Sequence, residues 1–388
     1  MRLIRIAVLA SAALLPLSAS ACTATSEAAD ATPIVIGADL ELSGADAAIG
    51  LVFERALHLK VDQINAKGGV DGHPLRLDPK DNRSDPTVSV TNVNALTNNP
   101  AVAAIVTGAC SPCSLNIAKI VEEKQIPTVS LAPATEVTHQ AQPTTYLFKL
   151  GPNADDSAAA LTTELRNAGI HTIGLLSTDD LDGKDAATAM ARAPKALTVV
   201  APPGQTFKAT DTDLSQPVHA VVSKHPEALV ISAFPAQAAL AAQAARDDGY
   251  TGRIFFNTTA AGELFLIGAA ATAAEGAIMV APQTLVIDDV IATTPAKTAR
   301  KQWFNDYTSK YGAFSGFSAY AADAVRLITD AIHSAGGPNR RRMRDLMEVS
   351  SFDGLSGQIR FAPGNHSGMM PQSLTTVVAR SGRWRLLG

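Results

Sequence analysis

The residues with the most obvious chemistry in this sequence are two cysteines, Cys110 and Cys113, separated by Ser111 and Pro112. A helix that begins at a C-x-x-C sequence lowers the pKa of a cysteine, because the helix N-terminus favours the thiolate. The spacing is compatible with redox catalysis, with free or metal-bound thiols, or with a structural disulfide. The only other cysteine is Cys22, and an exported protein commonly holds its two remaining cysteines as a structural bridge. The sequence favours the disulfide and leaves the other two interpretations open.

Hydroxyl side chains near the start of a helix form a second candidate site. Ser111 and Ser114 lie where the helix after the third expected strand begins, and the loop from Ser130 to Thr135 (S-L-A-P-A-T) follows the fourth strand. Free backbone N–H groups and the helix dipole stabilise a carboxylate at such positions. Simple capping is the alternative for each serine taken alone. Two such loops after neighbouring strands favour a carboxylate site.

Motifs of the common enzyme classes do not occur. The sequence has no G-x-G-x-x-G, G-x-x-x-x-G-K-[ST], H-E-x-x-H or G-x-S-x-G. Its 8 histidines show no metal-ligand spacing, and a formal net charge of -4 gives no general phosphate-binding surface. We therefore expect no catalytic residues, no metal, no cofactor and no nucleic-acid partner.

Short apolar strands alternate with amphipathic helices along the body of the chain. This alternation is typical of parallel sheets with helices on both faces, and it restarts near Tyr146. We expect an α/β protein with two Rossmann-like lobes, each with a parallel-sheet core, joined by a hinge. Ligands bind beyond the carboxyl ends of such strands, so the site is expected between the lobes. The strands are expected at 33–37, 75–77, 101–107, 126–131, 170–177, 198–201, 228–231, 253–257 and 276–280, with a β-rich end at 357–387.

The amino terminus carries an export signal. Arg2 and Arg5 precede an apolar run, 6–17, and Ala19-Ser20-Ala21 stands directly before Cys22. The run is shorter than the about 20 residues that a membrane helix needs. Small residues before a cysteine resemble a bacterial lipobox, in which the thiol is acylated; ordinary cleavage at A-x-A is the alternative. We expect an exported lipoprotein, anchored to the outer face of the bacterial cell membrane.

Several short motifs, each weak alone, occur in a specific order and spacing. They are the loop 42–44 (L-S-G), the turn 64–72 (I-N-A-K-G-G-V-D-G), the stretch 81–86 ending in S-D-P, the segment 126–135, the turn 274–276 (A-E-G) and the helix 319–325 (A-Y-A-A-D-A-V). Together they resemble the extracytoplasmic solute-binding proteins of branched-chain amino-acid ABC transporters, a leucine-binding-protein-like family with the type I periplasmic-binding-protein fold. The resemblance covers nearly all of the chain after the amino-terminal signal.

The resemblance implies ligand contacts at the matching positions. In this family a serine at the start of the helix after the third strand and an A-T loop hold the ligand's α-carboxylate. That role falls to Ser111, to Ala132 or Ala134, and to Thr135. An aromatic residue closes over the ligand, and Phe234 lies at its position, with ordinary packing as the alternative.

Two departures from the family pattern concern the ligand's charge and the disulfide. Relatives that bind aliphatic amino acids carry an acidic residue after the strand that ends here at Asn257, and this acid pairs with the ligand's α-ammonium. The present chain reads Asn257-Thr258-Thr259 at that place, which leaves Thr258 as the candidate contact. A buried ammonium without a counter-charge costs several kcal/mol, so either the ligand lacks an ammonium or another acid substitutes. Asp182 is the candidate acid, with a solvated helix cap as its alternative. The cysteine that relatives pair with Cys110 is absent, and Ser84 lies near its place.

We expect a solute-binding protein, not an enzyme, that captures a small carboxylate ligand, an amino acid or a related compound, by lobe closure. The resemblance implies ABC permease and ATPase subunits as partners, and a membrane contact through the lipid anchor only. The alternatives are a ligand-sensing regulatory lipoprotein on the same fold and, less favoured, a thiol-disulfide oxidoreductase. The expected domains are a signal peptide (1–21), a lipid-anchored tether (22–32), an N-terminal lobe (33–150 plus 283–370) and a C-terminal lobe (151–282 plus 371–388).

Overall fold

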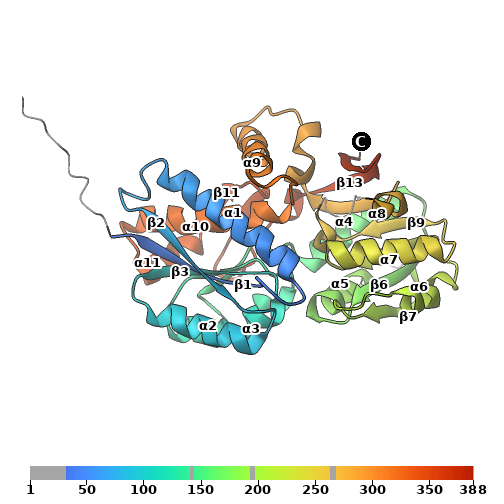
Figure 1. Cartoon of the computed structure of the whole chain (residues 1–388), viewed down its shortest axis with the longest axis horizontal. Helices are drawn as coiled ribbons and strands as arrows, with labels where there is room; N and C mark the ends of the chain where they lie inside the picture. Colours follow the sequence, from blue (N-terminus) through green and yellow to red (C-terminus); the bar gives the residue numbers. More distant parts are fainter. Residues whose placement is uncertain (1–31, 140–143, 193–196, 263–267, 388) are drawn as a thin grey trace, which may run out of the picture.

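Two α/β lobes lie side by side in the structure (Figure 1), as the sequence predicts. The computed structural model describes residues 32–139, 144–192, 197–262 and 268–387. The expected signal peptide, the lipidation site Cys22 and the tether up to residue 31 lie outside the described residues.

The first lobe is built on a parallel sheet of five strands in the order β2-β1-β3-β4-β5. Every residue of β1 is buried, because helices cover both faces of the sheet. Ile36 packs in one cluster with α1 and α10, and Val35, on the opposite face, packs with α2 and α3. The strands and helices are β1 Ile34–Leu40, α1 Ala47–Asn65, β2 Leu75–Asp81, α2 Pro86–Asn98, β3 Val102–Thr107, α3 Ser111–Glu123, β4 Thr128–Ser130 and β5 Leu147–Lys149.

The second lobe contains a sheet of seven strands in the order β14-β13-β10-β9-β8-β6-β7. Strands β6 to β10 run parallel, and β13 and β14 add an antiparallel edge beside β10. The elements are α4 Ala154–Asn167, β6 Thr172–Thr178, α5 Leu181–Ala191, β7 Thr198–Phe207, α6 Ser215–Val222, β8 Ala228–Ser232, α7 Pro235–Asp247, β9 Arg253–Phe256, α8 Ala269–Ala273, β10 Ile278–Pro282, β13 Leu374–Arg380 and β14 Arg383–Leu386.

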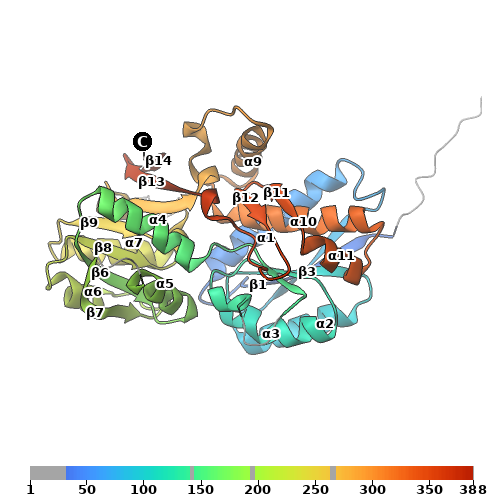
Figure 2. The same cartoon turned by 180° about the vertical axis from the view of Figure 1, so that it is seen from behind.

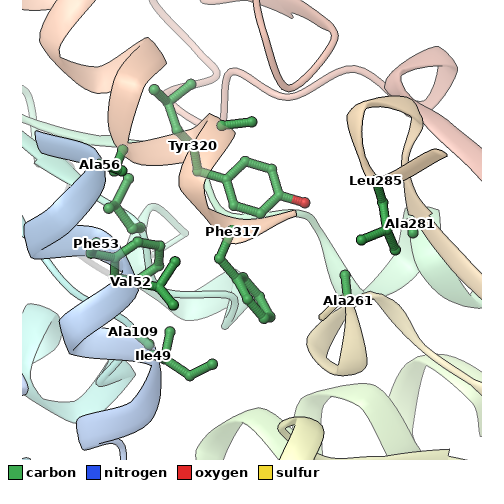
Figure 3. Packing of buried hydrophobic residues seen from close by; sticks show 14 of the residues in the cluster. Ile49, Val52, Phe53, Ala56, Ala109, Ala261, Ala281, Leu285, Phe317 and Tyr320 are labelled. Carbon is green, nitrogen blue, oxygen red and sulfur yellow. The ribbon is translucent and has the colours of Figure 1, made fainter. Parts of the chain in front are cut away.

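Late segments of the chain return to the first lobe before β13. Figure 2 shows α10 and α11 lying against the first lobe, although β9, which precedes them in sequence, belongs to the sheet of the second lobe. Phe53 of α1 meets Phe317 of α10 edge to face, with ring centroids 6.2 Å apart (Figure 3). The returning elements are α9 Pro295–Tyr311, α10 Phe317–Ala335, α11 Arg340–Met347, β11 Ser351–Asp353 and β12 Gln358–Arg360.

Local sequence signals explain several helix starts, including that of α11, where the Asn339 side chain accepts the N–H of Arg342. Asp85 caps α2 through the N–H groups of Thr87 and Val88, with Pro86 in the first turn, as expected for D-P-T. The helix α11 (R-R-R-M-R-D-L-M) was not expected, because it is short and shows little apolar periodicity. Only Met343 and Met347, one turn apart, bury their side chains in it.

Candidate functional site

Loops from the two lobes contact each other beyond the carboxyl ends of the parallel strands. Ser111, after β3, donates a hydrogen bond from Oγ to Oδ1 of Asp182, after β6, over 2.5 Å. The backbone N–H of Thr135, after β4, donates to Oδ2 of Asp185 over 2.8 Å. The structure therefore brings Ser111, Thr135 and Asp182 together at the lobe interface.

Ser111 links two loops of the first lobe and is fully buried at the start of α3. Its Oγ accepts the N–H of Ala134 over 3.1 Å while it donates to Asp182. The N–H of Ala132 points instead to Oγ of Ser130, over 3.2 Å. Of the two candidate alanines, Ala134 is therefore the one beside Ser111.

Ser114, the other serine of this helix start, has a structural role. Its hydroxyl lies 2.9 Å from that of Thr107 and 2.8 Å from that of Ser130. All three residues are buried, so this chain of hydroxyls joins β3, α3 and β4 beneath the lobe interface. Ser111 alone of the two serines reaches the second lobe.

The acidic residues at the start of α5 have distinct roles. Asp180 is the N-cap, since its Oδ1 accepts the N–H of Gly183 over 2.7 Å. Asp182 therefore does not cap the helix and points at Ser111. Burial first, and then the charges of Asp180, Asp46 and Asp185, raise the pKa of Asp182 well above its usual range.

A cavity of about 270 Å³ lies between α1 of the first lobe and α7 of the second. Its walls are mostly apolar and include Ile49, Val52 and Phe234, and Asp46 carries the one carboxylate among the lining residues that the structure describes. Neither Lys, Arg nor His occurs among the described residues that line it. Phe234 thus lies at a cavity between the lobes, the position expected for it.

Thr258 lies away from both groups of residues. It is buried in the second lobe, and its N–H donates to Oγ of Ser157 over 3.2 Å. It does not line the cavity, and none of its described contacts reaches the first lobe. Its proposed ligand contact remains a prediction.

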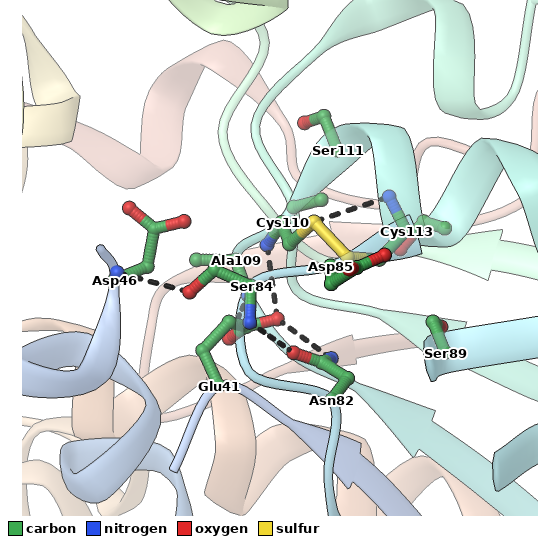
Figure 4. The surroundings of a disulfide bond; sticks show 12 residues. Glu41, Asp46, Asn82, Ser84, Asp85, Ser89, Ala109, Cys110, Ser111 and Cys113 are labelled. Carbon is green, nitrogen blue, oxygen red and sulfur yellow. Dashed lines mark hydrogen bonds between the residues drawn. A yellow bond between two sulfur atoms is a disulfide. The ribbon is translucent and has the colours of Figure 1, made fainter. Parts of the chain in front are cut away.

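The cysteines are joined in the structure by a disulfide between Cys110 and Cys113, and both are buried (Figure 4). Glu41 lies beside them and accepts the N–H groups of Ala109 and Cys110 over 2.9 and 3.1 Å. Sequence reasoning missed Glu41. Its only sequence signal is an acid directly after the buried strand β1.

Glu41, Cys110 and Cys113 offer three ligand atoms within 4.8 Å of one another, which is close enough for a metal ion. With the two sulfur atoms bonded to each other, the thiolates that would bind zinc do not exist. In this form the group is a structural cluster, which fixes the start of α3 and with it Ser111.

Buried carboxyl groups predict an unusual dependence of stability on pH. Burial raises the pKa of Glu41 to about 7 and, together with the charge of Asp180, that of Asp46 to about 6. Between about pH 4.5 and 7 the folded protein therefore keeps protons that the unfolded chain releases, so the free energy of unfolding falls as pH rises. We expect the ligand-free protein to melt at a higher temperature at pH 5 than at pH 7.5.

In the variant Glu41→Gln, the free energy of unfolding should fall less between pH 5 and pH 7.5 than in the wild type, by up to about 3 kcal/mol. Glu123→Gln is the matched control, because the Glu123 side chain is 62% exposed on α3 and should leave the pH profile unchanged. Thermal denaturation across the pH range measures both variants. A melting temperature that rises steadily from pH 5 to 7.5 would contradict the assignment.

Two lobes of parallel sheet with facing strand-end loops define the class of two-lobed ligand-binding proteins. The model of the periplasmic binding protein family matches residues 33–383. The chain belongs to this family, whose members bind solutes and are not enzymes, and the family places it outside the cytoplasm. None of the helices in the described ranges is long and apolar enough to cross a membrane.

Solved structures share the whole fold. An extracellular ligand-binding receptor from Rhodopseudomonas palustris HaA2 is 24% identical, with 92% of this chain and 100% of that chain covered and a TM-score of 0.82. The leucine binding protein LivK from Thermotoga maritima MSB8 is 21% identical, with 92% and 98% covered and a TM-score of 0.78. The branched-chain amino acid transporter substrate binding protein LivJ from Streptococcus pneumoniae, in complex with isoleucine, is 23% identical, with 92% and 99% covered and a TM-score of 0.77.

Proposed function

We propose that this periplasmic binding protein captures a small carboxylate ligand, an amino acid or a related compound, between its lobes and delivers it to the permease of an ABC importer. The observation that carries the proposal is the pair of carboxylates from the second lobe that lie on Ser111 and Thr135. Groups that donate hydrogen bonds to the chain's own carboxyl groups have the geometry to donate to a ligand's carboxylate. In the bound state the ligand replaces Asp182 and Asp185 at these donors.

Lobe closure provides the mechanism. A ligand that contacts both lobes only when they are closed stabilises that state by its differential affinity. The lobes comprise 33–150 plus 283–370 and 151–282 plus 371–388, a division that the membership of the strands in the two sheets supports. The chain then crosses between lobes at 150–153, 281–284 and 370–373.

The first crossing is held by a buried lysine that sequence reasoning missed. Lys149 ends β5 and is fully buried, and its Nζ donates to the carbonyl oxygens of Gly151 and Pro152 and to Oδ1 of Asn153 over 2.9, 3.2 and 2.9 Å. Burial lowers the pKa of Lys149 to about 8, against the opposing effect of Asp185, Asp182 and Asp156. This clasp fixes the conformation of the crossing about which the lobes move.

The proposal includes the lipid anchor. Acylation of Cys22 would tether the protein to the membrane beside its permease, and the small, polar residues that follow would link the anchor to the first lobe. We expect Cys22→Ser to shift the protein from the membrane fraction to the soluble extracytoplasmic fraction. Fractionation together with mass spectrometry of the mature N-terminus measures this, and an unmodified Cys22 in the wild-type protein would refute the anchor.

A thermal-shift screen tests the function. The panel contains the standard amino acids, their des-amino acids, the amines left by decarboxylation, organic acids and amides. A ligand at 100 times its Kd stabilises the protein by about 2.7 kcal/mol, which is readily detected. We expect hits among the compounds with a carboxylate, and a panel without any carboxylate-bearing hit would refute the proposal.

A further inference from the structure

Among the described residues that line the cavity between the lobes, Asp46 carries the one carboxylate, and its surroundings differ from those of the other acids nearby. Asp182 and Asp185 accept hydrogen bonds from Ser111 and Thr135, and Asp180 caps α5. No hydrogen bond or ion pair of the Asp46 carboxylate occurs within the described part of the chain. A half-buried carboxylate without such a partner is unfavourable unless something else compensates it.

Hydrogen bonds hold the backbone of Asp46 in place. The N–H of Asp46 donates to Oγ of Ser84 over 3.1 Å, and the carbonyl oxygen of Asp46 accepts from the N–H groups of Ile49 and Gly50. Gly50 must be glycine, because a Cβ there would lie 2.0 Å from the carbonyl oxygen of Glu41. Figure 4 shows the Asp46 carboxylate extending away from Ser84. Ser84 thus fixes the backbone of Asp46 in position.

The charge around this carboxylate is negative on both sides of the cavity. Asp180 of the second lobe adds to burial in raising the pKa of Asp46 to about 6. Lys149 is the cation near Asp182 and Asp185, and no cationic side chain lines the cavity within the described ranges. A positively charged ligand group would therefore be attracted by two acids and repelled by no cation of the cavity wall.

We propose that Asp46 is the receptor for a positively charged nitrogen of the ligand, so that the substrates are cation-bearing compounds such as amino acids rather than simple carboxylates. Apolar parts of such a ligand fit against Ile49, Val52 and the ring of Phe234, whose face also attracts a cation. Asp46 then supplies the counter-charge that Asn257 and its neighbours do not. This inference rests on the proposed function, because it assumes that the ligand occupies the space between the lobes.

The test compares matched compounds on matched variants of the full mature chain. The compounds are L-leucine, 4-methylpentanoate, which lacks the ammonium, and 3-methylbutylamine, which lacks the carboxylate, together with the corresponding trio of each screen hit. The variants are Asp46→Asn and Asp62→Asn. Asp62 lies in the last turn of the same helix and is 61% exposed, paired only with Lys310 among the described residues, so its change removes the same charge far from the cavity.

We expect Asp46→Asn to weaken binding of the amino acid at least about tenfold by isothermal titration and to leave the des-amino acid within about twofold. Asp62→Asn should change neither. Asp46→Glu should recover part of the affinity, which separates the role of charge from a change in folding. The inference is overturned if Asp46→Asn binds amino acids like the wild type, if des-amino acids bind the wild type as tightly as amino acids do, or if no cation-bearing compound binds at 10 mM, roughly a millimolar-affinity limit.

These outcomes separate this inference from the proposed function. Des-amino acids that bind as tightly as amino acids would refute the role of Asp46 and leave carboxylate capture standing. Amines that bind as tightly as amino acids would support Asp46 and refute the carboxylate site. Failure of every panel compound to bind would refute both.

Discussion

Replacing Ser111 and Thr135 by alanine together is expected to weaken binding of the carboxylate ligand at least about 100-fold. The Ser111 hydroxyl would donate to a charged oxygen of the ligand, and so would the Thr135 hydroxyl, and such hydrogen bonds contribute about 1.5–3 kcal/mol each. The backbone N–H of Thr135, which donates to Asp185, is kept in the variant. Ser111 is fully buried and already donates to a carboxylate, that of Asp182. Isothermal titration with the tightest-binding compound of the screen measures the loss.

A matched double variant controls for changes in stability. Ser223→Ala with Thr163→Ala removes the same two hydroxyls from exposed helix positions, where each bonds only to a carbonyl of its own helix among the described residues. Its affinity should equal that of the wild type. The carboxylate site would be wrong if the Ser111 and Thr135 double variant were folded and bound the ligand with unchanged affinity.

The variant Lys149→Met should lower the free energy of unfolding by about 3–5 kcal/mol. Methionine fills similar space but leaves the buried carbonyl oxygens of Gly151 and Pro152 and the partly buried Oδ1 of Asn153 without their charged donor. Because these acceptors lie in the first crossing between lobes, the loss acts on the hinge and the fold together. Chemical denaturation measures the change.

Lys119→Met is the control for this variant. Its side chain is 84% exposed, and an exposed pair with Glu123 contributes little, so a change within about 0.5 kcal/mol is expected. A loss below about 1 kcal/mol for Lys149→Met would show that the clasp is not needed. Failure of Lys149→Met to fold, while Lys119→Met folds, agrees with the expected destabilisation.

The alternation of strands and helices was predictable because it depends on local sequence. Buried runs such as Ile34–Leu40 and caps such as Asp85 act within a few residues, so the two-lobed α/β fold follows from the pattern. The antiparallel edge formed by β13 was expected only as β-rich sequence, since its pairing with β10 joins residues almost a hundred positions apart.

The place of Ser111 and Thr135 at the lobe interface was predictable, because both stand at strand ends that a parallel sheet brings to one edge. The structure places Ser111 on Asp182 and Thr135 on Asp185 of the second lobe, and their contacts with a ligand stay predictions.

Glu41 and Lys149 were missed because charged side chains are rarely buried. No motif near either residue indicates its partners, which are the N–H groups of Ala109 and Cys110 for Glu41 and the backbone of the first crossing for Lys149. Asp46 was overlooked because its carboxylate is distinguished by the lack of a hydrogen-bond or ion-pair partner within the described residues. That property depends on which residues the fold brings to the cavity, and the neighbours of Asp46 in sequence do not reveal it.

The two carboxylates that lie on Ser111 and Thr135 have a consequence for affinity. A ligand must displace Asp182 and Asp185 before its own carboxylate reaches these donors. The ligand-free conformation in which the two acids occupy the donors cannot bind the ligand, so the apparent affinity falls as the fraction of protein in that conformation rises. Ligands with a single weak contact would therefore fail to close the lobes.

Hydrogen–deuterium exchange with and without the tightest-binding compound of the screen tests the central claim most directly, because it reports which lobes the ligand orders. The account predicts slower exchange in both lobes, in the segments 41–50, 111–115 and 131–137 of the first and in 179–185 and 234–239 of the second. Protection confined to one lobe, or found only outside these segments, would contradict capture between the lobes.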